Sequence, residues 1–464
     1  MTQYFFGNAA EQGKSVKKFT NSKQQLGYLL TITAAMVVGA IADSRPVMAQ
    51  TQAPSAHVSP ASFHQSHACD CGSCNVPVYD ACGCGTCQNS CQQCSSQSYL
   101  LDGWLTQGFT LNPASPPDDF NTPVTFNDGA NDYQLNQLYF QLGKSFRIGR
   151  WHINARADVL YGTDYFFVTS TGLELHQDGT PRWNSEDGPR ENGAATYGLA
   201  LPQAYVDISP CGCNSTSFKF GHFYTTLGYE SVEDPLNKFY SRSYATQYAQ
   251  PFTHTGALIQ HRFSPRFVFV GGITRGWDTW EDPNGDLGFL GSVLLETGFG
   301  STISFGIHTG NEDLLGDNNR TAYSLVYEQP LSRSATWVIQ HNYGTEEDAA
   351  IDAAGQSDDA SWYGVVNYLL FNTSQSTTWG LRAEWFRDAD NARVVAIPLA
   401  AQVDGSDYVG VTLSRNQRIS TYMNWRMEAR WDWSDVEPLG QPGIFDTFED
   451  DNQFLLSTSV TIDF

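Results

Sequence analysis

Apolar and polar residues alternate one by one along many short stretches of the chain. The clearest stretch is 421–433, in which every second residue from Met423 onward is apolar and the residues between them are polar or charged. A β-strand turns successive side chains to opposite faces, so this period of two creates one apolar and one charged face. The same alternation occurs at 151–161, 378–387 and 453–464. These segments predict strands that lie between an apolar and a polar environment.

Sixteen segments between residue 100 and the end of the chain are candidate strands. They are 103–112, 133–144, 151–162, 197–208, 217–224, 254–263, 267–276, 287–297, 301–310, 321–329, 334–343, 361–372, 377–387, 407–415, 420–434 and 453–464. The connections after the even-numbered segments are short, and those after the odd-numbered segments are long and mostly polar. A soluble sandwich also alternates its side chains, but it has no reason to separate its connections by length. We predict an all-β fold, a transmembrane antiparallel up-and-down β-barrel of about 16 strands (roughly 14–18), with long extracellular loops and short periplasmic turns.

The composition fits a membrane barrel and removes other classes of protein. Only 16% of the 464 residues are charged, whereas 12 Trp, 22 Tyr and 28 Phe can supply a lipid-facing wall and its aromatic girdles. The net charge of −23 argues against a nucleic-acid partner, because phosphates are neutralised by Lys and Arg. After residue 42 no apolar run reaches the roughly 18–20 residues of a transmembrane helix, which excludes a helical membrane protein.

Residues 1–49 have the layout of a secretory signal peptide and its cleavage region. Four lysines between positions 14 and 23 precede an apolar run from Leu26 to Ala42, and small residues follow at the spacing of a cleavage site. An N-terminal membrane anchor is the alternative interpretation of this run. If it is a signal peptide, the protein is exported.

Residues 50–97 are rich in Ser, Gln, Pro and Cys and contain too few apolar residues to bury a core, so we expect a mostly disordered periplasmic segment. Disulfides are the usual use of cysteines in an exported chain, and thiolate–metal binding is the alternative; both stay open. Either could tie the segment to the periplasmic side of the barrel, because the C-x-C spacing recurs in a predicted short turn. The cysteines are Cys69, Cys71, Cys74, Cys82, Cys84, Cys87, Cys91 and Cys94 in the segment and Cys211 and Cys213 in the turn.

Four short motifs lie within residues 219–261. They are Gly221-His222-Phe223, Gly228-Tyr229-Glu230, the stretch from Asn237 to Ser243, and His254-Thr255-Gly256. This stretch resembles the β-barrel porin-2 family, although His222 stands where the family has Lys or Arg. The resemblance covers about residues 98–464, which we take as the barrel domain, and it implies a porin function without naming a solute.

The last residue, Phe464, resembles the terminal aromatic residue of Gram-negative outer-membrane barrels, which the barrel-assembly machinery reads. A Cys-rich segment before a barrel is similar to envelope proteins of planctomycete-type bacteria. These resemblances imply the cell outer membrane of a Gram-negative-type bacterium, with Phe464 at the periplasmic rim and the long connections outside. The expected partners are outer-membrane lipid, lipopolysaccharide and the assembly machinery, and a homotrimer is one candidate assembly.

Most acidic residues fall in the long connections, whereas the short turns are basic. The acidic groups lie within 118–132, 278–286, 346–359 and 435–451. Acidic loops can simply keep a surface soluble. They can also bind lipopolysaccharide through divalent cations, or favour cations at the mouth of a pore.

The connection 225–252 is the third long one and is the candidate constriction. By position it corresponds to the loop that folds into the lumen of sixteen-strand porins. Acid on this loop opposite base on the wall can filter solutes by size and charge; charge pairs that only brace the lumen are the alternative. The constriction residues are Glu230, Glu233, Asp234, Lys238 and Arg242 in the loop and Arg382, Arg426 and Arg430 on the wall.

We therefore predict a porin that passively conducts small polar or ionic solutes. The alternative is a structural outer-membrane barrel that anchors a Cys-cross-linked cell-envelope network, and a soluble carbohydrate-binding β-protein is a third interpretation. No G-x-S-x-G, H-E-x-x-H, Walker or G-x-G-x-x-G motif occurs in a suitable context. We expect no enzyme activity and no cofactor.

Overall fold

The computed structural model describes residues 98–184, 188–190, 193–210, 215–313, 315–351, 355–394, 405–437 and 440–464. All ten cysteines, the expected signal peptide and the segment 50–97 lie outside these residues. The disulfides, the metal alternative and the two N-terminal boundaries therefore stay predictions.

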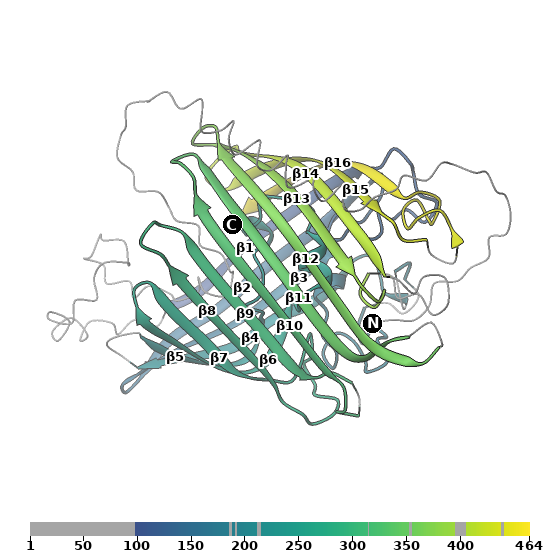
Figure 1. Ribbon diagram of the computed structural model, residues 1–464. Helices are drawn as coiled ribbons and strands as arrows, with labels where there is room; N and C mark the ends of the chain where they lie inside the picture. Colours follow the sequence, from purple (N-terminus) through teal and green to yellow (C-terminus); the bar gives the residue numbers. More distant parts are fainter. Residues whose placement is uncertain are drawn as a thin grey trace. The chain divides into compact units, whose positions relative to one another are not determined.

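Sixteen strands close into one antiparallel barrel (Figure 1). Each strand pairs with the strands before and after it in the sequence, and β16 pairs with β1. The strands are β1 (Ser98–Leu111), β2 (Asp132–Ile148), β3 (Trp151–Gly162), β4 (Gly198–Pro210), β5 (Thr216–Tyr224), β6 (Thr253–Ser264), β7 (Phe267–Thr274), β8 (Gly288–Glu296), β9 (Thr302–Asn311), β10 (Asn319–Pro330), β11 (Ala335–Ile351), β12 (Ser357–Asn372), β13 (Thr377–Asp388), β14 (Ser406–Arg418), β15 (Met423–Ser434) and β16 (Asn452–Asp463). The predicted fold class and the strand number are confirmed.

Charged side chains point into the barrel and apolar ones point out. On β15, Arg426 and Arg430 are each 1% exposed, whereas Trp431 is 39% exposed. On β16, Ser459 is 1% exposed and Leu456 is 42% exposed. A soluble sandwich buries its apolar faces instead. The apolar outer wall is the surface that a lipid bilayer covers.

The hairpin of β11 and β12 is longer than the alternation predicts. β11 runs to Ile351 and β12 starts at Ser357, so the acidic residues 346–347 belong to a strand. The connections 312–318 and 352–356 are short, so the prediction of a long connection after every odd-numbered strand is wrong at these two hairpins. Strand ends that extend beyond the lipid have water on both faces, so no apolar alternation marks them in the sequence.

The C-terminus closes the barrel at the rim that carries the short turns. The Phe464 N–H donates to Gly103 O at 2.9 Å, and the Phe464 ring lies edge-on to Phe140 with 5.6 Å between the ring centroids. The Asp463 N–H donates to the carbonyl of Tyr422, in the short turn between β14 and β15, at 2.8 Å. The terminal aromatic residue therefore lies beside the turns that are periplasmic in outer-membrane barrels.

Among the described residues of the long connections, three short helices occur: η1 (Thr163–Val168), η3 (Asp234–Leu236) and α2 (Tyr244–Tyr248). The side chain of Ser243 accepts a hydrogen bond from the Thr246 N–H at 3.2 Å and so caps the start of α2. In the part of the chain that the structure describes, no helix has the length and apolar character needed to cross a membrane.

Candidate constriction site

The connection 225–252, which we call the inner loop, lies across the lumen. It carries η3 and α2, and its ends meet where the Thr225 N–H donates to Phe252 O at 2.9 Å. Its middle part contacts inward-facing side chains of β13–β15 on one side and of β2–β3 on the other. The two sides differ in chemistry.

Arginines of β13 and β15 contact the inner loop, and each is no more than 1% exposed. Arg382 Nη1 lies 2.7 Å from Glu230 Oε1, and Arg426 is ion-paired with Asp234. Arg430 Nη1 donates to the backbone carbonyl of Arg242 in the loop at 2.7 Å. The predicted wall bases are thus in direct contact with the loop, and two loop acids are paired with them without an open gap between the charges.

Two carboxylates of the same wall bind the backbone of the inner loop. Glu384 Oε2 accepts a hydrogen bond from the Tyr244 N–H at 2.6 Å, and Glu428 Oε2 accepts one from the Tyr240 N–H at 2.8 Å. Both acids are buried. Sequence reasoning missed this role, although the alternation of β13 and β15 places both acids on the same inward face as the arginines.

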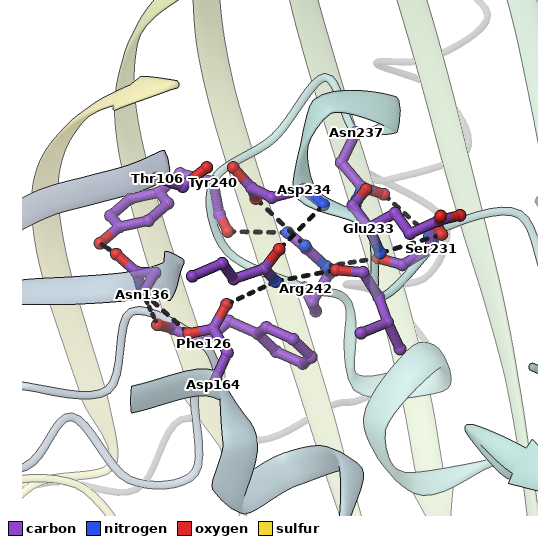
Figure 2. A network of polar contacts seen from close by, with 12 residues as sticks. Thr106, Phe126, Asn136, Asp164, Ser231, Glu233, Asp234, Asn237, Tyr240 and Arg242 are labelled. Atoms are coloured by element: carbon purple, nitrogen blue, oxygen red, sulfur yellow. Dashed lines mark hydrogen bonds and ion pairs between the residues drawn. The ribbon is translucent and has the colours of Figure 1, made fainter. Parts of the chain in front are cut away.

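At the β2–β3 wall, amide side chains of β2 join the inner loop to η1 (Figure 2). Asn136 Nδ2 donates to Asp164 Oδ1 at 2.9 Å, and Asn136 Oδ1 accepts from the Tyr240 hydroxyl at 2.7 Å. Gln137 Nε2 donates to Asp164 Oδ2 at 2.8 Å and to the carbonyl of Val232 at 2.9 Å. Among the described residues Asp164 has no cation within ion-pair distance, so its carboxyl group is bound by neutral donors, the two amides and the Thr163 hydroxyl at 3.3 Å.

Glu233 is held on this side by one shared arginine. Its Oε1 lies 3.1 Å from Arg156 Nη2 and accepts from Gln141 Nε2 at 3.0 Å. Arg156 Nη2 is closer to Asp158, at 2.6 Å from Oδ2. Two carboxylates therefore share one guanidinium group.

Arg242 braces the inner loop internally (Figure 2). Its Nη2 lies 3.2 Å from Asp234 Oδ1, and its Nη1 donates to the carbonyl of Tyr240 at 2.9 Å. The guanidinium carbon lies 4.5 Å from the centroid of the Phe126 ring. Of the predicted constriction residues, Arg242 thus supports the shape of the loop and does not face an acid on the wall.

Lys238 is the charged constriction residue that lacks an acidic partner among the described residues. Its backbone carbonyl accepts from Ser414 Oγ at 2.9 Å and from Asn416 Nδ2 at 2.7 Å, which fixes this part of the loop on β14. Burial, together with the charge of Arg426, lowers the pKa of its ammonium group. An uncompensated positive charge therefore lies in the loop near the basic wall.

The two walls shift the pKa values of the loop acids in opposite directions. Burial raises the pKa of Glu233 to about 7, because its loss of hydration outweighs the attraction to Arg156. For Glu230, burial acts in the same direction, but the charges of Arg382 and Arg242 and the hydrogen bond from the Ser243 N–H together outweigh it and leave the pKa below its ordinary value. The pKa of Asp234 is also lowered, because the charges of Arg426 and Arg242 and the side-chain hydrogen bonds together outweigh its burial.

The pKa of Asp164, the carboxyl group of η1, is raised like that of Glu233. Burial raises the pKa of Asp164 to about 7, more than the hydrogen bonds from Asn136 and Gln137 lower it, and the nearby charge of Asp234 adds to the increase. The loop acids paired with Arg382 and Arg426 therefore keep lowered pKa values, whereas amide hydrogen bonds do not offset the burial of Asp164.

Aromatic side chains of the wall pack against the inner loop. Trp362 Nε1 donates to the carbonyl of Ala249 at 3.3 Å. The Tyr368 ring lies 5.9 Å from the Phe239 ring, centroid to centroid, and all four residues are buried in one hydrophobic cluster. Packing and ion pairing together hold the loop in one position.

The motif residues lie at the base of the inner loop. Gly228 has a φ of 87°, a left-handed backbone conformation that favours glycine, and it lies against the amide group of Gln250. His222 is buried, and the His254 ring lies tilted against the His308 ring with 4.7 Å between the ring centroids. Within the described residues, no three His, Cys, Asp or Glu side chains are arranged to hold a metal ion.

Residues 98–464 match the family model described as "Putative beta-barrel porin-2, OmpL-like". The chain belongs to this family. The predicted family and the predicted outer-membrane location of this porin-2 barrel are confirmed.

The porin-2 barrel is similar in fold to solved outer-membrane channels. It superposes on the outer-membrane channel DcaP of Acinetobacter baumannii with a TM-score of 0.53 at 9% identity, over 80% of this chain and 98% of that chain. For an anion-selective porin from Comamonas acidovorans the TM-score is 0.50 at 11% identity, over 80% of this chain and 100% of that chain. At these identities the likeness shows the fold alone. No curated protein matches the sequence significantly.

Proposed function

We propose that this porin-2 barrel passively conducts small polar or ionic solutes and that the inner loop is its constriction. The observation that carries the proposal is the path of the inner loop across the lumen, between the β13–β15 wall and the β2–β3 wall. A loop fixed at both sides limits the size of a solute. Because Glu230 and Asp234 are in contact with Arg382 and Arg426, their charges largely cancel, which supports a size filter more than a filter by charge.

The dense packing around the inner loop also favours a second function. A lumen filled by Phe239, Tyr244 and Trp362 suits a closed barrel that anchors a Cys-cross-linked envelope network. Such a barrel would form no ion-conducting channel.

Conductance of the purified protein in planar lipid bilayers separates the two functions. Discrete conductance steps support the porin, and their absence with correctly folded protein supports the structural barrel. The variant E230Q/E233Q/D234N removes three acids that hold the inner loop, so we expect larger steps. The variant E347Q/D358N/D359N removes the same number of charges from exposed residues and should leave the step size unchanged. Equal steps in both variants would exclude the inner loop as the constriction.

The assembly partners are part of the same proposal. The place of Phe464, at the rim of short turns and against Phe140, supports its role as the signal for the assembly machinery. We also propose a homotrimer as the assembly, which chemical cross-linking of the protein in detergent would test.

A further inference from the structure

A hollow of about 400 Å³ lies on the outer wall of the barrel. Its lining includes Gly256 and Ala257 of β6, Ile273 of β7, and Arg275, Trp280 and Leu287 of the connection 275–287. Ile273 is 49% exposed and Leu287 is 60% exposed, which places the hollow on the outer face and not in the lumen. The small side chains of β6 leave room for an occupant between the strands and the connection.

The hollow lies at the level of the outer membrane surface. β7 ends at Thr274, and the connection 275–287 is at the opposite end of the strand from the short turn 265–266. Long connections of outer-membrane barrels face outside, and aromatic residues mark the lipid–water boundary there. Trp280 occupies this position beside the hollow.

Arg275 supplies an unpaired cation at the hollow. It is exposed, and its Nη1 donates to the carbonyl of Trp280 at 2.8 Å. No carboxylate of the described residues lies within ion-pair distance of its guanidinium group. The nearby Glu281 is instead paired with Arg182, at 3.5 Å. The remaining N–H groups of Arg275 can bind an anion, and the guanidinium fork matches the geometry of a phosphate.

We propose that the hollow binds an acyl chain of a phosphorylated lipid of the outer leaflet and that Arg275 binds the phosphate of that lipid. The volume lies in the range of small-molecule sites. The mostly apolar lining favours an apolar occupant, and lipid chains are the apolar groups that reach this wall.

Native mass spectrometry of the purified, detergent-solubilised protein with bis-phosphorylated lipid A tests the proposal. We expect R275Q to bind this lipid about tenfold more weakly than the unmodified protein, because a charge-assisted contact is lost. A257F places a large side chain in the hollow and should weaken binding of phosphorylated and dephosphorylated lipid A alike. R415Q is the matched control, since Arg415 lies beside Trp379 near the other end of the barrel; it should bind lipid normally.

Heat-modifiable migration on gels shows that each variant is folded. Unchanged lipid binding in both R275Q and A257F would overturn the proposal. So would a loss of oligomers in A257F with unchanged lipid binding, since the hollow would then be a contact between copies. The conductance of R275Q should equal that of the unmodified protein, so a failure of lipid binding is distinguishable from a failure of the porin function.

Discussion

The two walls that hold the inner loop compensate the buried carboxyl groups of the loop in different ways. On β13 and β15, Arg382 and Arg426 compensate the buried charges of Glu230 and Asp234. On β2 and β3, amides and one shared arginine compensate less well, and the pKa of Glu233 rises to about 7. The acids that hold the loop on β13 and β15 therefore stay ionised near neutral pH, whereas those that hold it on β2 and β3 titrate there.

Removal of the ionic attachment should have the largest effect. In R382Q/R426Q, Glu230 and Asp234 remain buried without their partners, and a broken buried pair costs about 3–5 kcal/mol. We expect the inner loop to leave the wall while the barrel stays folded. Limited proteolysis should then cleave within 225–252, and R415Q, which changes an arginine outside the lumen, should stay resistant. Equal resistance of both variants would show that the arginines do not hold the loop.

Removal of a wall carboxylate should have a smaller effect. E428A leaves the Tyr240 N–H without its acceptor, and an unsatisfied buried donor costs about 1–3 kcal/mol. Hydrogen exchange at residues 240–241 should accelerate accordingly. E428Q keeps an acceptor oxygen and should exchange more slowly than E428A. If E428A matches the unmodified protein, Glu428 is not a structural anchor of the loop.

A change of pH should have the smallest effect and should act on the β2–β3 side. The pKa values of Glu233 and Asp164 are raised to about 7, so between their ordinary values and pH 7 the attached loop binds more protons than a released loop. Attachment on this side therefore weakens as the pH rises through that window. Glu230 and Asp234 have lowered pKa values, so their contribution is present above the ordinary carboxyl pKa and is lost only in acid.

Hydrogen exchange checks this pH dependence, after correction for the intrinsic exchange rate. Exchange at residues 232–234 should increase between about pH 5 and pH 7.5, by at most about tenfold per pH unit for each carboxyl group. In E233Q/D164N it should be flat over the same range. An increase of the same size in this variant would assign the pH dependence to other groups.

The strands could be predicted from the sequence because the bilayer and the lumen impose opposite polarity on the two faces of each strand. The six apolar residues of 423–433 alternate with five polar ones for this reason. The alternation of apolar and polar residues ends where a strand extends beyond the lipid. Residues 346–347 extend β11 beyond the alternating stretch: Glu346 is paired with Arg320 and Glu347 is exposed, so neither face is apolar and no alternation indicates that part of the strand.

Part of the candidate site could be predicted in the same way. Arg382 and Arg426 lie on inward faces opposite the loop, so their approach to loop acids follows from the strand order. The contacts of Glu384 and Glu428 could not be predicted, because their partners are backbone N–H groups whose positions depend on the path of the loop. Asp164 was missed because η1 lies in a long connection, where no periodicity indicates which side chains turn inward.

Single-channel conductance of a variant in which residues 230–243 are replaced by a short Gly/Ser linker tests most directly whether the inner loop is the constriction. The replacement removes every loop group that pairs with Arg382, Arg426 and Arg156 while keeping all sixteen strands. We predict a several-fold larger conductance step than that of the unmodified protein in the same bilayer. A step of unchanged size, from a variant that is folded and inserted, would contradict the account.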